Sequence, residues 1–371
     1  MDTVARKPAS RGPTPRSGAA EAAARAADAA AGRATVTTKP LTLALQGGGA
    51  HGAFTWGVLD RLIEDERLTF EGVSANSAGA MNATAMAYGL AAGGRAGARE
   101  ALAGFWKRIS EAGANSPLQP SWLDKLMGNH SLDNSPSFLF FDLLTRLMSP
   151  YQFNPTNFNP LRQVLEKSID FEVLRQSPMK IFLSATNVRT GKIKVFERHE
   201  IGPDAVLASG CLPFMFQAVE IDGENYWDGG YMGNPALFPL IYACECSDVL
   251  IVHINPLERT ELPRTATDIL NRINEISFNS SLMREMRAIS FVSKMIDQGI
   301  IKEGSLKRMK IHGILDDEVM SGLGVASKLN ADWDFLTTLR DAGRARASAW
   351  LDAHFNKIGV DSTVDIAATY L

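Results

Sequence analysis

A short apolar run, Leu41–Leu45, leads almost directly into the glycine cluster Gly47, Gly48 and Gly49, and this junction limits how the chain can fold. A run of this length before glycines is typical of a buried strand that turns sharply, and residues 53–66 have helical spacing. A second apolar segment near Val73 leads to a serine turn and another helix-like stretch. This order of strands, turns and helices predicts an α/β fold with a mainly parallel sheet.

The glycine turn is predicted to present backbone N–H groups to an anion. Glycine has no Cβ to block the approach, and the following helix begins with the positive end of its dipole. The anion could be a phosphate or an oxyanion formed during a reaction. Gly47, Gly49 and Gly52 also fit the pattern G-x-G-x-x-G, which needs an acidic residue after the second strand. A serine turn stands there instead, which weakens the dinucleotide interpretation. A dinucleotide-binding protein is therefore kept only as an alternative.

Ser77 lies between Ala75 and Gly79 in the pattern A-x-S-x-G. A nucleophile elbow places a strained serine between a strand and a helix, with small residues two positions before and after it. Ala75 departs from the glycine that is usual before the serine. The pattern by itself also fits a serine that caps the next helix.

A third motif surrounds Asp228. Residues 219–228 predict a hairpin that turns at Asp222–Gly223, with Asp228 at the end of its second strand. Gly229 and Gly230 then redirect the chain, and Asn234–Pro235 is predicted to start another helix. An aspartate held in this way can point at a serine hydroxyl, although turn carboxylates before glycines are also common.

These three motifs together resemble the patatin-like phospholipase family over residues 41–260. Weaker similarity supports the match at Thr186–Gly191 and Ala208–Pro213. The resemblance implies a three-layer α/β/α sandwich with a mainly parallel sheet, plus C-terminal helices. His51 departs from the family, which usually has Arg or Lys at this position, and a neutral histidine is a poorer partner for an anion.

The resemblance also implies a Ser–Asp dyad, with Ser77 as nucleophile and Asp228 as general base. The N–H groups of Gly47, Gly48 and Gly49 would form the oxyanion hole. The expected function is hydrolysis of lipid acyl esters, as in phospholipase A or lysophospholipase, with no metal or cofactor. Two further alternatives are an esterase or depolymerase acting on a non-phospholipid ester and a non-catalytic lipid-binding protein.

Composition restricts the class of protein. A formal net charge of −3 argues against a dedicated nucleic-acid binder. The three cysteines, Cys211, Cys244 and Cys246, are too few for a disulfide framework, and we expect the last two to pack in a core helix. No apolar stretch is long enough to span a membrane. We therefore expect a cytoplasmic protein that contacts a lipid substrate, with peripheral membrane contact as a further hypothesis.

Three regions differ in composition from the predicted catalytic domain at 41–260. Residues 1–40 are rich in Ala and Pro, with seven basic and three acidic side chains, and predict a disordered basic tail. Residues 113–160 contain six prolines and an apolar segment at 138–148, which suits either a lid over an acyl-chain pocket or packing on the core. Residues 261–371 predict a mostly helical extension packed on the same domain.

Overall fold

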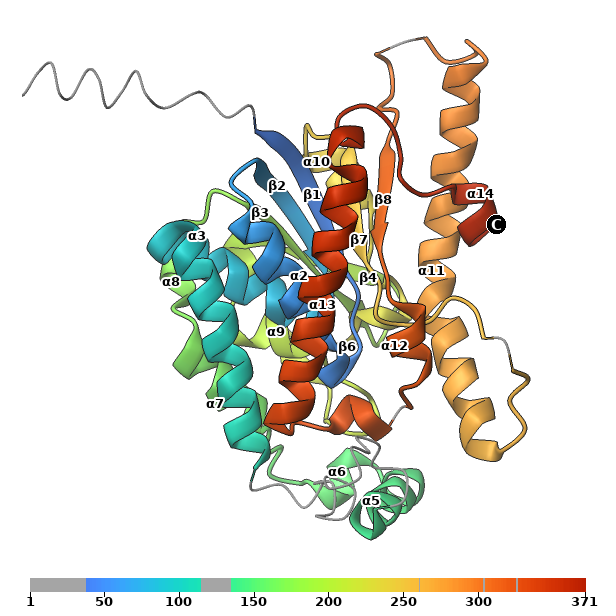
Figure 1. Ribbon diagram of the computed structural model, residues 1–371. Coiled ribbons are helices and arrows are strands. Elements are labelled where there is room, and N and C mark those ends of the chain that lie inside the picture. The colour runs from blue at the N-terminus through green and yellow to red at the C-terminus, as the bar shows by residue number, and fades with distance from the viewer. Residues whose placement is uncertain (1–37, 115–134, 260, 303, 325) are drawn as a thin grey trace, which may run out of the picture. The chain divides into compact units, whose positions relative to one another are not determined.

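The computed structural model describes residues 38–114, 135–259, 261–302, 304–324 and 326–371 (Figure 1). Residues 1–37 of the predicted tail at 1–40 and residues 115–134 of the insertion at 113–160 therefore lie outside the described residues. Eight strands form one sheet in the order β5-β6-β3-β2-β1-β7-β8, with β4 paired to β3. The strands are β1 (Lys39–Leu45), β2 (Leu68–Ala75), β3 (Lys180–Asn187), β4 (Ile193–Glu197), β5 (Val219–Ile221), β6 (Glu224–Asp228), β7 (Asp248–Val252) and β8 (Lys310–Ile314).

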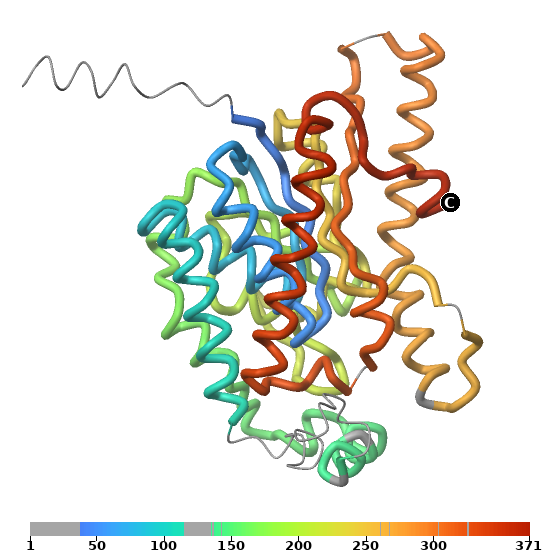
Figure 2. Tube along the Cα trace, in the orientation of Figure 1, coloured from blue at the N-terminus to red at the C-terminus, as the bar shows by residue number. Residues whose placement is uncertain are grey.

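The centre of the sheet is parallel. Strand β1 pairs in parallel with β2 and β7, β2 with β3, and β7 with β8, whereas β4, β5 and β6 join through antiparallel pairs. The helices are α2 (Gly52–Glu64), α3 (Ala78–Gly113), α5 (Pro136–Leu147), α6 (Pro150–Phe153), α7 (Pro160–Ser168), α8 (Phe171–Leu174), α9 (Pro203–Ser209), α10 (Phe238–Ala243), α11 (Ala266–Asp297), α12 (Asp317–Ser321), α13 (Trp333–His354) and α14 (Ile366–Tyr370). Figure 2 traces the chain from β7 into α11 and back through β8 to α13.

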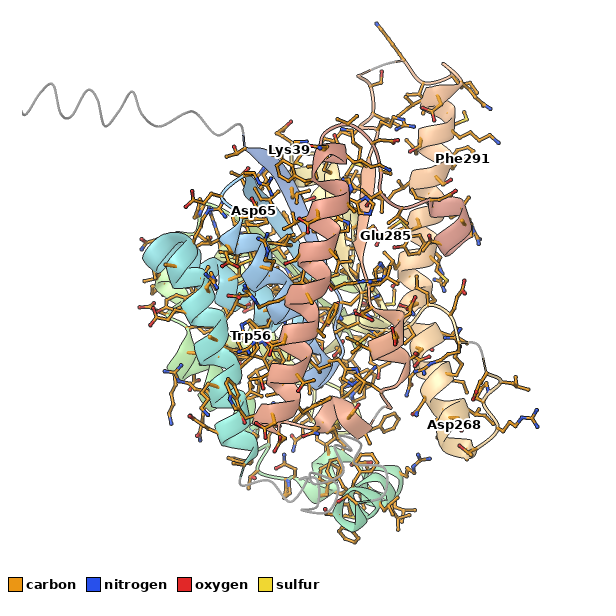
Figure 3. All side chains as sticks on the ribbon, viewed as in Figure 1. Lys39, Trp56, Asp65, Asp268, Glu285 and Phe291 are labelled. Carbon is orange, nitrogen blue, oxygen red and sulfur yellow. The ribbon has the colours of Figure 1, made fainter. Side chains whose placement is uncertain are left out.

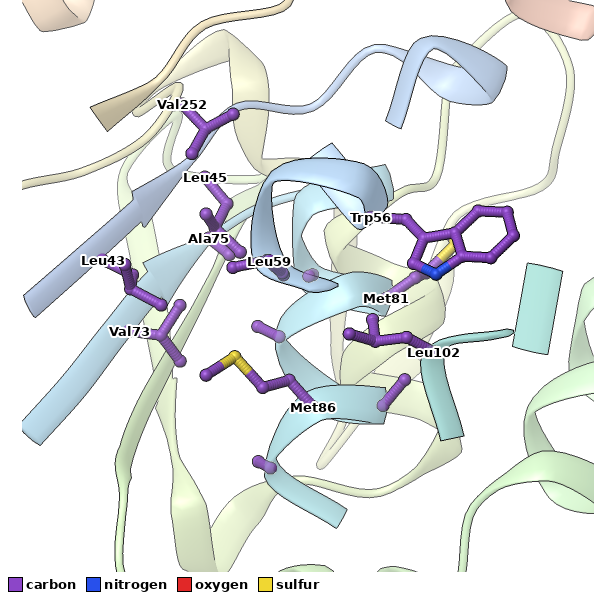
Figure 4. Close-up of a cluster of buried hydrophobic side chains, with 14 of the residues drawn as sticks. Leu43, Leu45, Trp56, Leu59, Val73, Ala75, Met81, Met86, Leu102 and Val252 are labelled. Carbon is purple, nitrogen blue, oxygen red and sulfur yellow. The ribbon is translucent and has the colours of Figure 1, made fainter. Parts of the chain in front are cut away.

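Helices cover both faces of the sheet, because successive side chains of a strand point to opposite faces. Leu41, Leu43 and Leu45 of β1 pack in a core shared with α2, α3 and α13, part of which is drawn in Figure 4. Ala44 belongs to a second core on the other face, with apolar residues of α10, α11 and α14. The predicted three-layer α/β/α sandwich is thus confirmed.

Local predictions succeed where one sequence pattern dominates and fail in two places. The chain at Asn234–Pro235 does not start a helix, because α10 begins only at Phe238 and the side chain of Asn234 is engaged elsewhere. Cys244 and Cys246 are buried, but they lie at the end of α10 and in the loop before β7. None of the helices in the described part of the chain has the length and apolarity needed to cross a bilayer.

Helices α2 and α13 approach closely at two glycines. A Cβ at Gly57 of α2 would collide with the backbone of Arg340, and a Cβ at Gly343 of α13 would collide with the backbone of Phe54. Beside this contact, the ring of Trp56, which is labelled in Figure 3, stacks on Trp106 of α3 at 6.4 Å between centroids. Because backbone cannot move aside as a side chain can, both positions require glycine.

We therefore expect Gly57→Ala and Gly343→Ala each to lower the free energy of unfolding by about 1–3 kcal/mol. The matched control is Gly104→Ala in α3, where a Cβ would meet only the end of the Arg108 side chain. That substitution should be neutral or stabilise by up to about 1 kcal/mol, since alanine favours a helix over glycine. Urea titration measures all three, and equal effects at the three sites would contradict the proposed close packing.

Candidate active site

Ser77 occupies a strained turn between β2 and α3. Its φ of 51° and ψ of −127° are unusual for a residue with a side chain. The Ser77 N–H anchors the turn to the end of α9. It donates to the carbonyl and hydroxyl oxygens of Ser209, each at 3.0 Å. Ser77 is partly exposed, whereas Asn76 and Ala78 on either side are buried. The strained backbone and the partial exposure are what the predicted nucleophile elbow would require.

Small residues let the elbow fit against its neighbours. A Cβ at Gly79 would lie 2.5 Å from the carbonyl oxygen of Leu45, so this position requires glycine. Gly210 provides a second close surface, since a Cβ there would lie 3.5 Å from the Cα of Ser77. Ala75, which departs from the usual glycine, is fully buried, and its methyl group packs in the apolar core (Figure 4). The elbow therefore accommodates that departure.

Asp228 ends β6 and is only 1% exposed. Its N–H donates to the carbonyl of Cys211 at 2.8 Å, and its own carbonyl accepts from the Thr186 hydroxyl at 2.8 Å. One carboxylate oxygen accepts the Gly230 N–H at 2.7 Å. These contacts leave little freedom to the backbone or the side chain, so the carboxylate has a defined direction.

Burial raises the pKa of the Asp228 carboxyl to about 6. The Gly230 N–H opposes that rise, and the Ser77 hydroxyl and the Asn76 amide lie close enough to the carboxylate to oppose it as well. The structure thus brings the two residues of the predicted dyad together. At neutral pH the carboxylate is mostly ionised, yet it is a stronger base than an exposed aspartate.

The glycine turn lies directly against the elbow. A Cβ at Gly47 would be 2.6 Å from the Cβ of Ser77, so only glycine fits there. The Gly47 N–H donates to Asn234 Oδ1 at 2.7 Å and is therefore committed within the protein. Gly48 and Gly49 are more exposed, and their N–H groups have no acceptor among the described residues. These two groups are the donors left for an anion.

The other glycines of the three motifs lie at close packing contacts. A Cβ at Gly52 would be 2.7 Å from the Cβ of Ala78, which joins the start of α2 to the start of α3. Gly229 packs against the backbone of Ser184, and Gly230 packs against the ring of Phe278. These positions support the shape of the site rather than supply chemistry to it.

His51 does not supply a positive charge. It is 2% exposed, and burial together with Lys328 and Arg259 holds its pKa well below the usual value. Its Nε2 lies 2.8 Å from the hydroxyl of Ser327, whose own proton goes to the carbonyl of Gly324 at 2.7 Å. His51 is therefore a neutral donor that ties the glycine turn to the segment before α13.

A family model described as patatin-like phospholipase matches residues 43–241, more than half of the chain. The chain belongs to the patatin-like phospholipase family. The solved structure of VipD from Legionella pneumophila covers 86% of this chain and 67% of its own, with 16% sequence identity and a TM-score of 0.39. No curated protein matches the sequence.

Membership of the patatin-like family supports lipid acyl hydrolase activity in general. It does not account for a buried polar network that positions the glycine turn. The side chain of Gln46 accepts from the N–H groups of Ile254 and Asn255 and donates to Asn279 at 3.1 Å. Asn255 also donates to the carbonyl of Gly47 at 2.8 Å. Sequence reasoning missed these amides, and the position of Asn255 after a buried strand was the one signal available.

The strain at Ser77 can be measured through stability. Glycine adopts a φ of 51° without a steric penalty, whereas alanine keeps the strain of serine. We therefore expect the Ser77→Gly variant to be more stable than Ser77→Ala, with a free energy of unfolding about 1 kcal/mol higher. The same two substitutions at Ser293, inside α11, should give the opposite order, because glycine weakens a helix. Thermal unfolding that ranked both sites alike would argue against the elbow.

Proposed function

We propose that Ser77 and Asp228 form the catalytic dyad of a serine acyl hydrolase that acts on lipid acyl esters. The observation that carries the proposal is the buried Asp228 carboxylate close to a strained serine, beside a glycine turn with two N–H groups that have no acceptor in the described part of the chain. A serine hydroxyl is a weak nucleophile and needs a base within reach. Asp228 would be that base, and no other group is required to take the proton.

In the first half of the reaction, the Ser77 oxygen attacks the ester carbonyl and its proton passes to Asp228. The carbonyl oxygen becomes an oxyanion, which accepts from the N–H groups of Gly48 and Gly49. The intermediate collapses, the bond to the alcohol breaks, and the leaving oxygen takes the proton from Asp228. In the second half, water attacks the acyl-serine and gives its proton to Asp228, and Ser77 recovers it when the fatty acid leaves.

The acid side of the pH profile should report the Asp228 carboxyl. Because its raised pKa of about 6 belongs to a group that must be ionised, kcat/KM should rise through about pH 6 and level off above it. Asp228→Asn should lower kcat by about 10²-fold or more and remove this rise, and Ser77→Ala should abolish turnover. Short and long acyl esters, followed by phospholipid vesicles, are the substrates to test.

The matched control for that experiment is Asp222→Asn at the tip of the same hairpin. Asp222 has a φ of 53°, which asparagine tolerates, and it lies away from the serine turn at the other end of β6. We expect the activity of the Asp222→Asn variant to equal that of the wild type. A Ser77→Ala variant that kept its activity, or an Asp222→Asn variant as impaired as Asp228→Asn, would refute the dyad.

Contact with a lipid surface is the second part of the proposal. Four large apolar side chains of α5 are at least half exposed: Leu139, Phe140, Leu143 and Leu147. The neighbouring α6 segment contacts the loop that follows Gly210, since Gln217 donates to the Asn154 carbonyl at 2.8 Å. Gly210 itself packs against Ser77. Phe141 of α5 packs edge-to-face on Phe153 of α6, at 6.5 Å between ring centroids. Contacts therefore lead from α5 through α6 and this loop toward the serine turn, which suits a substrate held in a membrane.

Replacing Phe140, which is 67% exposed, with serine should weaken contact with vesicles. We expect the ratio of vesicle hydrolysis to soluble-ester hydrolysis to fall several-fold, because burial of a phenylalanine ring in lipid contributes about 2 kcal/mol. Phe291→Ser is the control, since Phe291 of α11 is 62% exposed but lies on another element (Figure 3). If both variants change the ratio equally, α5 is not a specific lipid contact.

A further inference from the structure

Lys328 reaches the glycine turn from far outside the region matched by the family model. It lies in the short 3₁₀ helix η4 (Ala326–Leu329), and its backbone carbonyl packs directly on Gly49. Its ammonium donates to Asn255 Oδ1 at 2.9 Å. The other end of the same amide, Asn255 Nδ2, donates to the carbonyl of Gly47 at 2.8 Å. A continuous chain of hydrogen bonds therefore runs from the ammonium to the turn.

This chain acts on an N–H group of the site because a peptide unit is planar. The carbonyl of Gly47 and the N–H of Gly48 belong to one trans peptide and point in opposite directions. When Asn255 holds the carbonyl, the Gly48 N–H is held away from Asn255, on the open side of the turn. That N–H is one of the two donors without an acceptor among the described residues.

The ammonium helps to set which way the Asn255 amide faces, together with Gln46, whose Oε1 accepts from Asn255 Nδ2 at 3.3 Å. An ammonium group has only donors, so it can face the amide oxygen but not the amide NH₂. While Lys328 is charged, the flipped amide is excluded and Nδ2 stays on the Gly47 carbonyl. A neutral amine has a lone pair and accepts from an NH₂ group, so deprotonation removes one of the contacts that hold the amide in this orientation and leaves only the two acceptor oxygens, Gly47 O and Gln46 Oε1, to hold it.

We propose that Lys328 is a positioning residue of the oxyanion hole, which acts through Asn255 to fix the Gly47–Gly48 peptide. The inference rests on the proposed function of the Ser77 site. It gives the segment between β8 and α13 a part in the reaction, although that segment contacts no reacting atom. His51 contributes by holding Ser327, the residue before Lys328, at 2.8 Å.

The charge on Lys328 depends on the groups that face it from several elements. Burial lowers its pKa, Glu275 of α11 raises it, Arg259 lowers it and Asp228 of β6 raises it, and the result is about 8. His51 is neutral and adds no charge. Glu275 is itself paired with Arg259 at 2.6 Å and with Arg272 at 3.2 Å. Lys328 thus loses its proton within the range in which the enzyme can be assayed.

Lys328→Met is the first variant to test, with a soluble acyl ester at pH values from about 5 to 10. We expect kcat to fall about tenfold or more with KM within about twofold, because a misplaced donor affects the transition state and not substrate binding. The wild type should lose activity above about pH 8, and Lys328→Met should lack this alkaline fall. Lys192→Met, at an exposed hairpin lysine, is the control and should resemble the wild type.

Lys328→Arg keeps the charge, because arginine stays protonated throughout the assay range. It should retain more activity than Lys328→Met, and its alkaline fall should move above pH 10. Thermal unfolding of each variant separates a folding defect from a kinetic one. If Lys328→Arg folds and still loses activity near pH 8, or if Lys328→Met matches the wild type, the proposal is wrong.

A double-mutant cycle tests the route through Asn255. Lys328→Met should cost nothing further in the Asn255→Ala background, since the group through which it acts is already missing. An equal loss in both backgrounds would overturn the positioning role. Ser77→Ala is assayed beside these variants. If the wild type hydrolyses no ester, the proposed function fails as a whole, whereas an inactive Ser77→Ala beside a normal Lys328→Met rejects only the role of Lys328.

Discussion

The close approach of Gly47 to Ser77 is the contact on which the candidate site depends. No Cβ fits at Gly47, because it would lie 2.6 Å from the Cβ of Ser77 and 2.8 Å from the amide nitrogen of Asn76. The same contact places the glycine turn directly against the serine turn. Parallel pairing of β1 with β2 makes this possible, since the two strands end side by side and deliver both turns to one edge.

Polar groups buried around that contact are stabilised by partners, because an unpaired one costs about 1–3 kcal/mol. Gln46, Asn255 and Asn279 bond to one another and to backbone groups of three segments. In the described part of the chain, the side-chain amide of Asn76 and Nδ2 of Asn234 have no hydrogen-bond partner. Through Asn255, this network holds the carbonyl of Gly47 and therefore the direction of the Gly47–Gly48 peptide.

The sequence predicts the elements of this site better than their supports. The apolar run before the glycines and the hairpin at Asp222 are local patterns, and the structure has a strand and a hairpin at these positions. Asn234–Pro235 has the local signature of a helix start, yet Asn234 bonds to Gly47, which lies 187 residues earlier. Lys328 lies in no recognisable motif at all. Both residues act through contacts distant in sequence, which no local pattern encodes.

The region after residue 260 illustrates how much of a site can lie outside its motifs. All residues of the three motifs fall before that point, but Asn279 supports Gln46, Phe278 packs on Gly230 and Lys328 packs on Gly49. Strand β8 pairs with β7 in the same sheet, and α13 packs on α2, the helix that begins at the glycine turn. Since the turn at Ser77 is strained, surrounding structure has to offset the cost of about 1–3 kcal/mol. A chain ending near residue 260 would retain Ser77 and Asp228 and would lose the contacts that hold the glycine turn against them.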